Sequence, residues 1–367
     1  MPQVEIRRPF CCEYLYMARF SPLTRMAQVF TTPHSPEDFL RLVNPLSSSR
    51  QLRGIVTEVI PETEDSATIR FHPGRGWHAH EAGQWARIGV EIDGVRQWRS
   101  YSLTTAGGED PAITVTAIGA ISEALVRNTK PGDVLFLAPP QGDFVLPEHP
   151  RPLLMITAGS GLTPVMSMIR TLVRRRADAD VQLLHSSRTL DGSLFRDELQ
   201  ELADLDHGLT VKHWITSEQG RIDLSGTKDL DAAVPDWRER ATYVCGPTEM
   251  INEAEALWKA AAREHQLVIE RFAPVILPGA GGAGGHVTFE KSDKEVDADG
   301  DTTLLEAGED AGVVMPSGCR MGICQSCLVP LVAGQVRDLR TGEVHGEEGQ
   351  LVQTCVSTAA GPVHLDV

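Results

Sequence analysis

The sequence is poor in basic residues and contains no long apolar run. It holds 34 Lys and Arg against 50 Asp and Glu, which gives a formal net charge of -16 over 367 residues. A nucleic-acid partner needs a surplus of Lys and Arg to face its phosphates, so this charge argues against nucleic-acid binding. No uninterrupted apolar stretch approaches the roughly 18 residues of a membrane-spanning helix, and we therefore expect no integral membrane protein.

The sequence also lacks a targeting segment and a disulfide framework. Its start, Met-Pro-Gln-Val-Glu-Ile-Arg-Arg, leads into a mixed segment without a small-residue cleavage site, so we expect no secretory signal and a cytoplasmic protein. Of the seven cysteines, only Cys11, Cys12 and Cys245 lie outside the group described next. Three such cysteines make no disulfide framework.

Four cysteines near the carboxyl end have the spacing of iron-sulfur ligands. Cys319, Cys324 and Cys327 lie within nine residues, and Cys355 follows after 27 intervening residues. The pattern C-x4-C-x2-C with a distant fourth cysteine holds a plant-type [2Fe-2S] cluster. The alternative is a structural zinc site, but zinc sites usually pair two short cysteine knuckles, and only one short pair is present here.

The length and the sequence pattern predict several domains. A chain of 367 residues is too long for one typical core. Short alternating strands in residues 50–150 predict a small antiparallel β-barrel. Strand-helix alternation in residues 151–272 predicts an α/β domain with a parallel sheet. A glycine-rich linker, residues 273–285, is expected to be a flexible tether to a small mixed α+β domain at residues 286–367.

Residues 1–49 form an N-terminal extension whose role the sequence leaves open. Ser35-Pro-Glu-Asp begins a pattern typical of one short helix that ends before Pro45. An aromatic-rich stretch upstream is consistent with contact to a partner or a membrane surface, and equally with a translation start at Met17 or Met26.

Two segments of the expected barrel have features of a flavin site. In Arg99-Ser-Tyr-Ser-Leu-Thr, strand alternation places Arg99 and Tyr101 on one face, where a cation and a ring suit a phosphate and a flavin. Ser102 falls on the other face, although its amide and hydroxyl can still reach past the end of the strand. Gly119-Ala-Ile-Ser122 begins a helix, whose unpaired amides suit a pyrophosphate. The alternative is an ordinary strand followed by an ordinary helix start.

Three turns of the expected parallel sheet indicate a dinucleotide site. Ala158-Gly-Ser-Gly-Leu-Thr-Pro follows the first strand, where dinucleotides bind in such sheets, although it is not the full glycine fingerprint. Ser186-Ser-Arg188 follows the second strand, and its hydroxyls and guanidinium suit the 2′-phosphate of NADP unless this is only a surface turn. Cys245 ends a later strand at the same crevice, although a lone buried cysteine more often packs a core.

In this order, the motifs resemble those of the ferredoxin-NADP reductase superfamily. The resemblance is to the oxygenase- and desaturase-linked reductases with a C-terminal ferredoxin module, and it covers residues 51–367. It implies a flavin-binding barrel, an NAD(P)-binding domain and a β-grasp ferredoxin-like domain. It also implies FAD, a [2Fe-2S] cluster and NADPH, with FMN and NADH as the alternatives.

The resemblance further implies roles for individual residues. Flavin contacts are expected from Arg99, Tyr101, Ser102, Leu103, Gly119 and Ser122. Nucleotide contacts are expected from Gly159, Gly161, Ser187, Arg188, Gly246 and Pro247. Thr163 and Cys245 are the expected catalytic residues of the hydride-transfer crevice, and Phe272 is expected to shield the flavin.

The expected function is electron transfer from NADPH through FAD and the cluster to a terminal acceptor. The expected acceptor is a desaturase of the fatty-acyl type or a monooxygenase, because Asn44-Pro-Leu46 resembles the extension of reductases that serve membrane desaturases. Such a partner would make the cytoplasmic protein peripheral to the membrane. The alternatives are an NADH-dependent reductase of an aromatic-ring or steroid oxygenase, an iron-sulfur redox sensor, and a zinc-stabilised binding module.

The acidic charge is concentrated in the last segment of the chain. Residues 286–367 contain 14 acidic and 5 basic residues, which amounts to -9 of the total -16. Complementary fields speed the encounter of redox partners, so this segment is a candidate docking surface for a basic partner. The alternative is a solvated acidic face without a partner.

Overall fold

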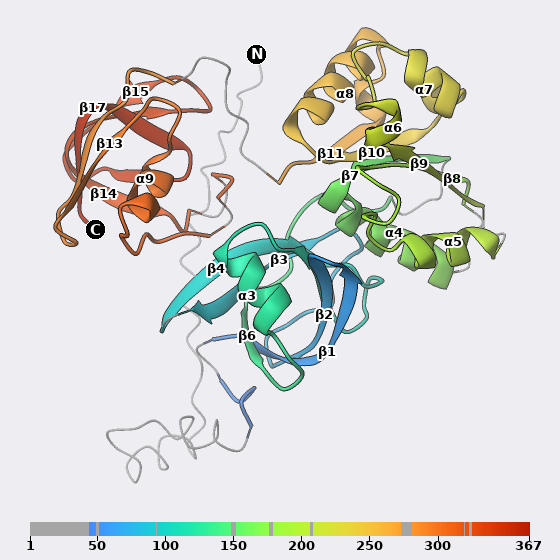
Figure 1. Ribbon diagram of the computed structural model, residues 1–367, viewed down its shortest axis with the longest axis horizontal. Helices are drawn as coiled ribbons and strands as arrows, with labels where there is room; N and C mark the ends of the chain where they lie inside the picture. The colour runs from blue at the N-terminus through green and yellow to red at the C-terminus, as the bar shows by residue number, and fades with distance from the viewer. Residues whose placement is uncertain are drawn as a thin grey trace, which may run out of the picture.

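A computed structural model shows three β-sheets that belong to three lobes of the molecule (Figure 1). The residues that it describes are 44–48, 51–92, 94–147, 152–175, 179–205, 208–272, 281–318, 320–322 and 325–367. Among the helices of these residues, none combines the length and the apolar character needed to cross a bilayer. The helix expected at residues 35–43 lies outside the described ranges.

The first lobe is an antiparallel six-stranded sheet in the order β4-β3-β6-β1-β2-β5. Its elements are β1 (Arg53–Thr63), β2 (Ser66–Pro73), β3 (Trp85–Ile92), β4 (Val95–Ser102), β5 (Ala112–Thr116), α3 (Ala120–Asn128) and β6 (Val134–Leu137). A bridge between Leu103 and Ile113 joins the ends of the two edge strands, so the sheet closes into a barrel there. Ile69, Phe71 and Ile88 fill its interior, which helix α3 covers with Ile121 and Leu125.

The second lobe is a parallel five-stranded sheet in the order β11-β10-β7-β8-β9. Its strands are β7 (Leu153–Ala158), β8 (Val181–Ser187), β9 (Leu209–Ile215), β10 (Ala241–Cys245) and β11 (Leu267–Glu270). Its helices are η1 (Gly159–Gly161), α4 (Leu162–Arg174), α5 (Arg196–Asp204), α6 (Thr216–Gln219), α7 (Lys228–Ala233), η2 (Trp237–Glu239), α8 (Thr248–Ala260) and η3 (Glu264–Gln266). Alternate residues of β7 enter separate cores: Met155 packs with α4 and α5, and Ile156 packs with α7 and α8.

The third lobe is a mixed sheet crossed by one helix. The order is β13-β12-β17-β14-β15 with β16 paired to β14, and β12 runs parallel to β17. Its elements are β12 (Gly285–Phe289), β13 (Lys294–Ala298), α9 (Leu304–Asp310), β14 (Leu328–Asp338), β15 (Val344–His345), β16 (Leu351–Gln353) and β17 (Ser357–Leu365). Thr303 caps α9 in a reciprocal box with Glu306. The expected multi-domain fold class, with barrel, parallel sheet and C-terminal α+β domain, is confirmed.

The last residues of the expected glycine linker do not form a flexible tether. Strand β12 begins at Gly285, and Gly284 bridges Ala360. A Cβ on Gly285 would collide with the carbonyl oxygen of Gly361, and one on Gly300 would collide with that of Gly282. Gly284 and Gly285 therefore belong to the third sheet, and Gly282 packs against Gly300 of the same lobe, because close backbone packing requires glycine there. Residues 273–280 lie outside the described ranges.

The barrel contacts both other lobes, but with very different numbers of polar contacts. Helix α4 is bonded to the loop after β4: Ser167 Oγ donates to the carbonyl of Thr105 at 2.6 Å, and Arg170 Nη1 donates to that of Thr104 at 2.6 Å. On the other side, the hydrogen bond that joins described residues of the barrel and the third lobe runs from Arg87 to Ser326. Among the described residues, the barrel therefore shares more of these hydrogen bonds with the parallel sheet than with the third lobe.

Candidate functional site

A pocket of about 360 Å³ opens between the barrel and the parallel sheet. It gathers the end of β4, the start of α3, the turn after β7 and the end of the parallel sheet. The expected site residues on its wall are Arg99, Tyr101, Ser102, Gly119, Ser122, Thr163 and Phe272. Ser102, the last residue of β4, lies on this wall, as expected of a residue that reaches past the end of its strand.

The side chains of this pocket suit an aromatic ligand that carries phosphate. Burial, followed by the charge of Arg320, lowers the pKa of Arg99. Nearby carboxylates therefore offset only part of the positive charge of its guanidinium. Burial raises the pKa of Tyr101 to about 12, so its ring remains neutral and can lie against another ring. The buried hydroxyl of Ser100 has no hydrogen-bond partner among the described residues. This donor set fits a flavin nucleotide.

The start of helix α3 faces the same pocket. The hydroxyl of Ser122 accepts hydrogen bonds from the amides of Ile118 and Gly119, both at 3.0 Å. Gly119 has an extended backbone, and a Cβ there would have no described atom within 4 Å. The space in front of the first turn is therefore open, and the amides of that turn would meet a pyrophosphate.

A second pocket of about 270 Å³ lies at the carboxyl ends of β7, β8 and β10. The expected nucleotide residues on its wall are Gly159, Ser187, Arg188 and Pro247. Sequence reasoning missed Arg221, which also lines this pocket and lies 3.6 Å from a carboxylate oxygen of Glu249. Arg221 belongs to no motif, so only the folded chain brings it beside Arg188.

Two expected nucleotide residues act through the backbone. A Cβ on Gly161 would collide with the carbonyl oxygen of Cys245, and one on Gly246 would lie 2.5 Å from Cε of Met250. The turn after β7 therefore touches the turn after β10 without side chains between them. This contact brings the two crevice motifs together, because only glycine permits such close approach.

Cys245 and Leu103 lie behind the pocket walls. The thiol of Cys245 is fully buried in the core under α4, and burial, followed by Glu270, raises its pKa. Leu103 is fully buried in the barrel core. Neither side chain is among the lining residues of the two pockets described above. The functional roles expected of them stay predictions.

Glu270 is a titratable group that sequence reasoning missed. It pairs with Cys245 in the register of β10 and β11 and precedes Phe272 by two residues. Burial, followed by the charge of Asp143, raises the pKa of Glu270 to about 7. A carboxyl group beside the crevice therefore changes its charge near neutral pH. In the sequence it is a charged residue at the end of a strand, which does not indicate a raised pKa.

Two of the four expected cluster ligands lie side by side. Sγ of Cys327 is 3.3 Å from Sγ of Cys355, and both residues are buried. This distance is too long for a disulfide bond of about 2.05 Å. Arg340 and Gln353 both donate to the carbonyl of Gly322 at 3.1 Å, which fixes the loop between the ligands. The two thiols fit a shared metal centre, whereas Cys319 and Cys324 lie outside the described residues.

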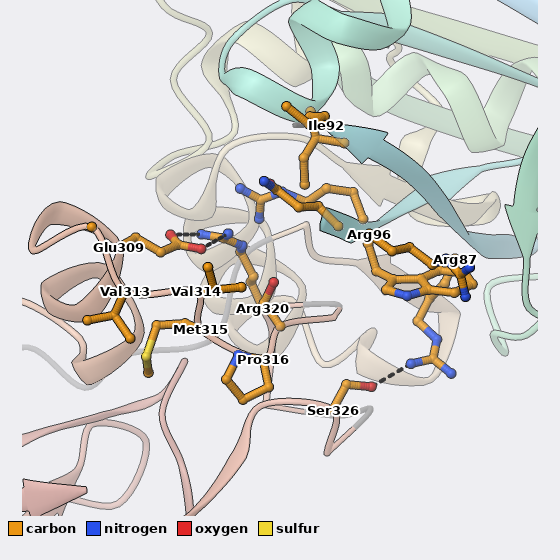
Figure 2. Close-up of a pocket in the computed structure, with 16 residues that line it drawn as sticks. Arg87, Ile92, Arg96, Glu309, Val313, Val314, Met315, Pro316, Arg320 and Ser326 are labelled. Carbon is orange, nitrogen blue, oxygen red and sulfur yellow. Dashed lines mark hydrogen bonds and ion pairs between the residues drawn. The ribbon is translucent and has the colours of Figure 1, made fainter. Parts of the chain in front are cut away.

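A third and larger cavity, of about 990 Å³, separates the barrel from the C-terminal lobe (Figure 2). Arg99 and Ile121 line both this cavity and the pocket between the barrel and the parallel sheet. From the other side it is lined by Ser317, Arg320 and Ser326, which flank the cysteine ligands in the sequence. The flavin-type pocket therefore continues towards the cluster loop.

Together, a flavin-type pocket, a dinucleotide crevice and a cysteine site define a nucleotide-dependent flavin and iron-sulfur oxidoreductase. Residues 155–256 match the oxidoreductase NAD-binding domain, and residues 287–360 match the 2Fe-2S iron-sulfur cluster binding domain. An "NADPH oxidoreductase" of Mycobacterium tuberculosis is 48% identical over 99% of this chain and 97% of its own length. The "NADH oxidoreductase HCR" of Escherichia coli is 30% identical over 76% of this chain and 86% of its own.

A solved structure shows the same arrangement of domains. The phthalate dioxygenase reductase superposes with a TM-score of 0.60 at 22% identity, over 88% of this chain and 99% of that one, which supports the fold. The chain belongs to the ferredoxin-NADP reductase family, as a member with a C-terminal 2Fe-2S ferredoxin domain. The expected oxidoreductase class and the expected cofactors FAD, NAD(P)H and [2Fe-2S] are thereby confirmed.

Proposed function

We propose that this protein supplies electrons from NADPH to a terminal desaturase of the fatty-acyl type or to a monooxygenase. When bound, FAD and the cluster supply the redox chemistry that converts an electron pair into single electrons. The chain itself binds these groups and fixes their relative positions, which is the protein's main contribution in cofactor enzymes.

The observation that carries this proposal is the continuity of the three sites. The turn after β7 contributes Gly159 to the nucleotide pocket, and the first turn of α4, which follows it directly, contributes Thr163 to the flavin pocket. Arg99 and Ile121 then connect the flavin pocket to the cavity beside the cluster loop. A sensor or a zinc-stabilised module needs no such path, so this continuity favours the reductase.

Residues of the crevice position the two ring systems. The hydroxyl of Thr163 donates to the carbonyl of Ser160 at 2.8 Å, which shapes the turn that forms one wall of the flavin pocket. Phe272 lies on the same wall and is 41% exposed, so its ring is available to cover the flavin. We propose that Thr163 orients the nicotinamide and that Cys245 supports this turn from the core.

NADPH is the proposed donor because two arginines line the nucleotide pocket. Arg188 is exposed, whereas Arg221 already lies near Glu249. A 2′-phosphate would pair with Arg188 and would leave Ser187, whose hydroxyl donates to the carbonyl of Thr189 at 2.9 Å, to shape the turn. The 48% identical relative carries the name "NADPH oxidoreductase", which supports this choice.

We propose that the acceptor is an oxygen-activating enzyme. Several relatives are named as parts of such systems, among them the ferredoxin reductase component of the 3-ketosteroid-9-alpha-monooxygenase of Mycolicibacterium smegmatis, 29% identical over 77% of this chain. That name supports a steroid oxygenase as the second candidate, and the alternative stays an NADH-dependent reductase of an aromatic-ring or steroid oxygenase. A membrane desaturase would place this protein at the cytoplasmic membrane surface through its partner, with the acidic C-terminal domain as the docking face.

The acceptor is tested by reconstitution. Partner enzymes recovered with the protein from its native cell are assayed for NADPH consumption coupled to product formation. Desaturated acyl chains or a monooxygenated product, formed with NADPH and not without the reductase, are expected. Coupling only to a ring or steroid oxygenase with NADH would replace the first proposal by the second. If the protein reduces no acceptor, and its oxidation instead changes how it binds another protein, the redox-sensor alternative is supported.

We also propose domain boundaries for the functional units. The flavin-binding barrel spans residues 50–150, and the nucleotide domain spans residues 151–272. For the predicted linker, residues 273–285, we propose that the last five residues belong to the ferredoxin domain, because Gly284 pairs with Ala360 and Gly285 pairs with Ala298.

A further inference from the structure

Two side chains from other parts of the ferredoxin domain hold the loop between the expected cluster ligands. Arg340 Nη1 and Gln353 Nε2 both donate to the carbonyl of Gly322, each at 3.1 Å. Arg340 Nη2 also donates to Oε1 of Gln353 at 3.0 Å, so the two side chains act together. Gly322 lies between Cys319 and Cys324 in the sequence. The loop is therefore tied to β16 and to the turn that follows β14.

Glycine at position 322 lets the guanidinium of Arg340 come close to the backbone of this loop. A Cβ on Gly322 would lie 2.8 Å from Nη1 of Arg340 and 2.9 Å from Cγ1 of Val356. The φ of Gly322 is +73°, a value that residues with a side chain rarely adopt. Arg340 therefore lies against the loop and beside the residue that follows Cys355.

The ion pair between Arg340 and Asp338 has its positive end at the loop. Nε and Nη2 of Arg340 donate to the carboxylate of Asp338 at 3.1 and 2.6 Å, whereas Nη1, at a different edge of the guanidinium, donates to Gly322. Asp338 is the last residue of β14, and its side chain is 15% exposed, against 34% for Arg340. The cation is therefore nearer to the loop than the carboxylate is.

Arg340 also interacts with two of the expected ligands through its charge. The hydrogen bond to Asp338 raises the pKa of Arg340 against the effect of burial, and the charges of Asp338, Cys355 and Cys327 raise it further. Attraction between opposite charges stabilises both partners. One-electron reduction adds a negative charge to the centre that these cysteines hold, so a cation at this position favours the reduced form.

We propose that Arg340 raises the reduction potential of the [2Fe-2S] cluster through its charge, and that Asp338 and Gln353 hold its guanidinium in place. A higher potential favours the transfer of one electron from the reduced flavin to the cluster. This consequence rests on the proposed function, in which the cluster takes electrons from the flavin. The alternative is an ion pair that only stabilises the turn after β14.

The test is a redox titration of the full-length holoprotein with dithionite and mediators, followed by electron paramagnetic resonance of the reduced cluster. Arg340→Gln removes the cation, and Asp338→Asn removes the anion that offsets part of its charge. Arg337→Gln is the matched control, because Arg337 donates to the carbonyl of Gly342 at 2.9 Å instead of to the loop. The titration contains no NADPH and no acceptor, so its result does not depend on the proposed electron path.

The two variants are expected to shift the potential in opposite directions. Arg340→Gln should lower the equilibrium constant for reduction of the cluster about threefold to tenfold, because one partly screened positive charge is lost. At 59 mV per tenfold change for one electron, this is a fall of about 30 to 60 mV. Asp338→Asn should raise the potential by a smaller amount, and Arg337→Gln should leave it close to the wild-type value.

An ion pair with a purely structural role gives a different result. Shifts of the same sign in Arg340→Gln and Asp338→Asn, no shift in either, or an equal shift in Arg337→Gln would overturn the proposal and leave the proposed function standing. Iron and sulfide are measured in every sample, and loss of the cluster from both variants would also overturn it. If one of them alone loses its cluster, the direction of the shift in the other decides. A wild type without iron and sulfide would overturn this proposal together with the proposed function.

Discussion

Arg99 shows how a single residue takes part in two sites. Alternation along β4 places it on the flavin pocket with Tyr101, and the same guanidinium lines the cavity that faces the cluster loop. Its motif could be found in the sequence, but its second contact depends on the docking of a domain more than 200 residues away. Sequence patterns report local periodicity and do not reveal contacts between residues so far apart in the chain.

Arg188 is expected to determine the preference for NADPH. Replacing it with Ala should raise KM for NADPH by about tenfold or more, because a charge-assisted bond to the 2′-phosphate is lost, and should leave KM for NADH nearly unchanged. Steady-state assays with ferricyanide measure both. Arg196→Ala is the control, since Arg196 is a partly exposed arginine of the same domain that pairs with Asp191. Equal effects on both nucleotides would contradict the assignment.

Glu270 is expected to make stability depend on pH. Its pKa is raised to about 7 in the folded chain from 4.5 as the reference, so the folded state holds a proton that the unfolded state has lost between these values. Stability should therefore fall as the pH rises through this window, by about 1 to 3 kcal/mol in total. Glu270→Gln should remove this fall, which unfolding temperatures at pH 5 and pH 8 would show. Parallel curves for both proteins would refute it.

Several individual elements could be predicted from the sequence with their bounds. The β-branched and aromatic residues of 209–215 and 241–245, each followed by turn signals, predict two strands, and β9 and β10 have the same bounds. Ser102 lines the flavin pocket at the last residue of β4, although alternation alone places its side chain on the other face. Arg221 and Glu270 were missed, because their neighbours belong to other strands and helices.

The sequence predicts a flexible segment before β12, because glycine-rich segments occur both in flexible linkers and where two backbones pack closely. The structure separates the two roles. A Cβ on Gly285 would strike the backbone of Gly361, whereas one on Gly282 would meet the side chain of Arg337, with the nearest atom, Nε, at 3.2 Å. A backbone atom cannot move aside as a side chain can.

Gly285→Ala is therefore expected to destabilise the ferredoxin domain, by about 1 to 3 kcal/mol or more, and to lower cluster content. Gly282→Ala, three residues earlier, should retain nearly full content because Arg337 can move. The ratio of iron and sulfide to flavin after purification measures the effect. Full cluster content in both variants would mean that this segment acts as a flexible tether.

At the scale of the whole molecule, the three lobes are attached unequally. Helix α4 holds the barrel against the nucleotide sheet through Ser167, Arg170 and Arg174, the last donating to the carbonyl of Gly107 at 2.6 Å. The bond between Arg87 and Ser326 is the counterpart seen among the described residues on the ferredoxin side. We expect the flavin and nucleotide domains to move as one body and the ferredoxin domain to separate from them.

Arg87→Gln should accordingly slow transfer from flavin to cluster without slowing flavin reduction. Because the substitution removes the charge and the bond to Ser326, cytochrome c reduction should fall about threefold to tenfold, in line with the loss of one hydrogen bond. Ferricyanide reduction, which reports on the flavin, should stay unchanged. A parallel loss of both activities would instead indicate damage to the barrel.

The most direct measurement is anaerobic mixing of the purified holoprotein with NADPH, followed by visible absorption and by electron paramagnetic resonance of frozen samples. We predict that the flavin band bleaches first and that a reduced [2Fe-2S] signal then grows, in samples that contain iron and sulfide in proportion to flavin. A protein that contains neither iron nor sulfide, or one whose flavin is reduced while the cluster stays oxidised, would contradict the proposed path.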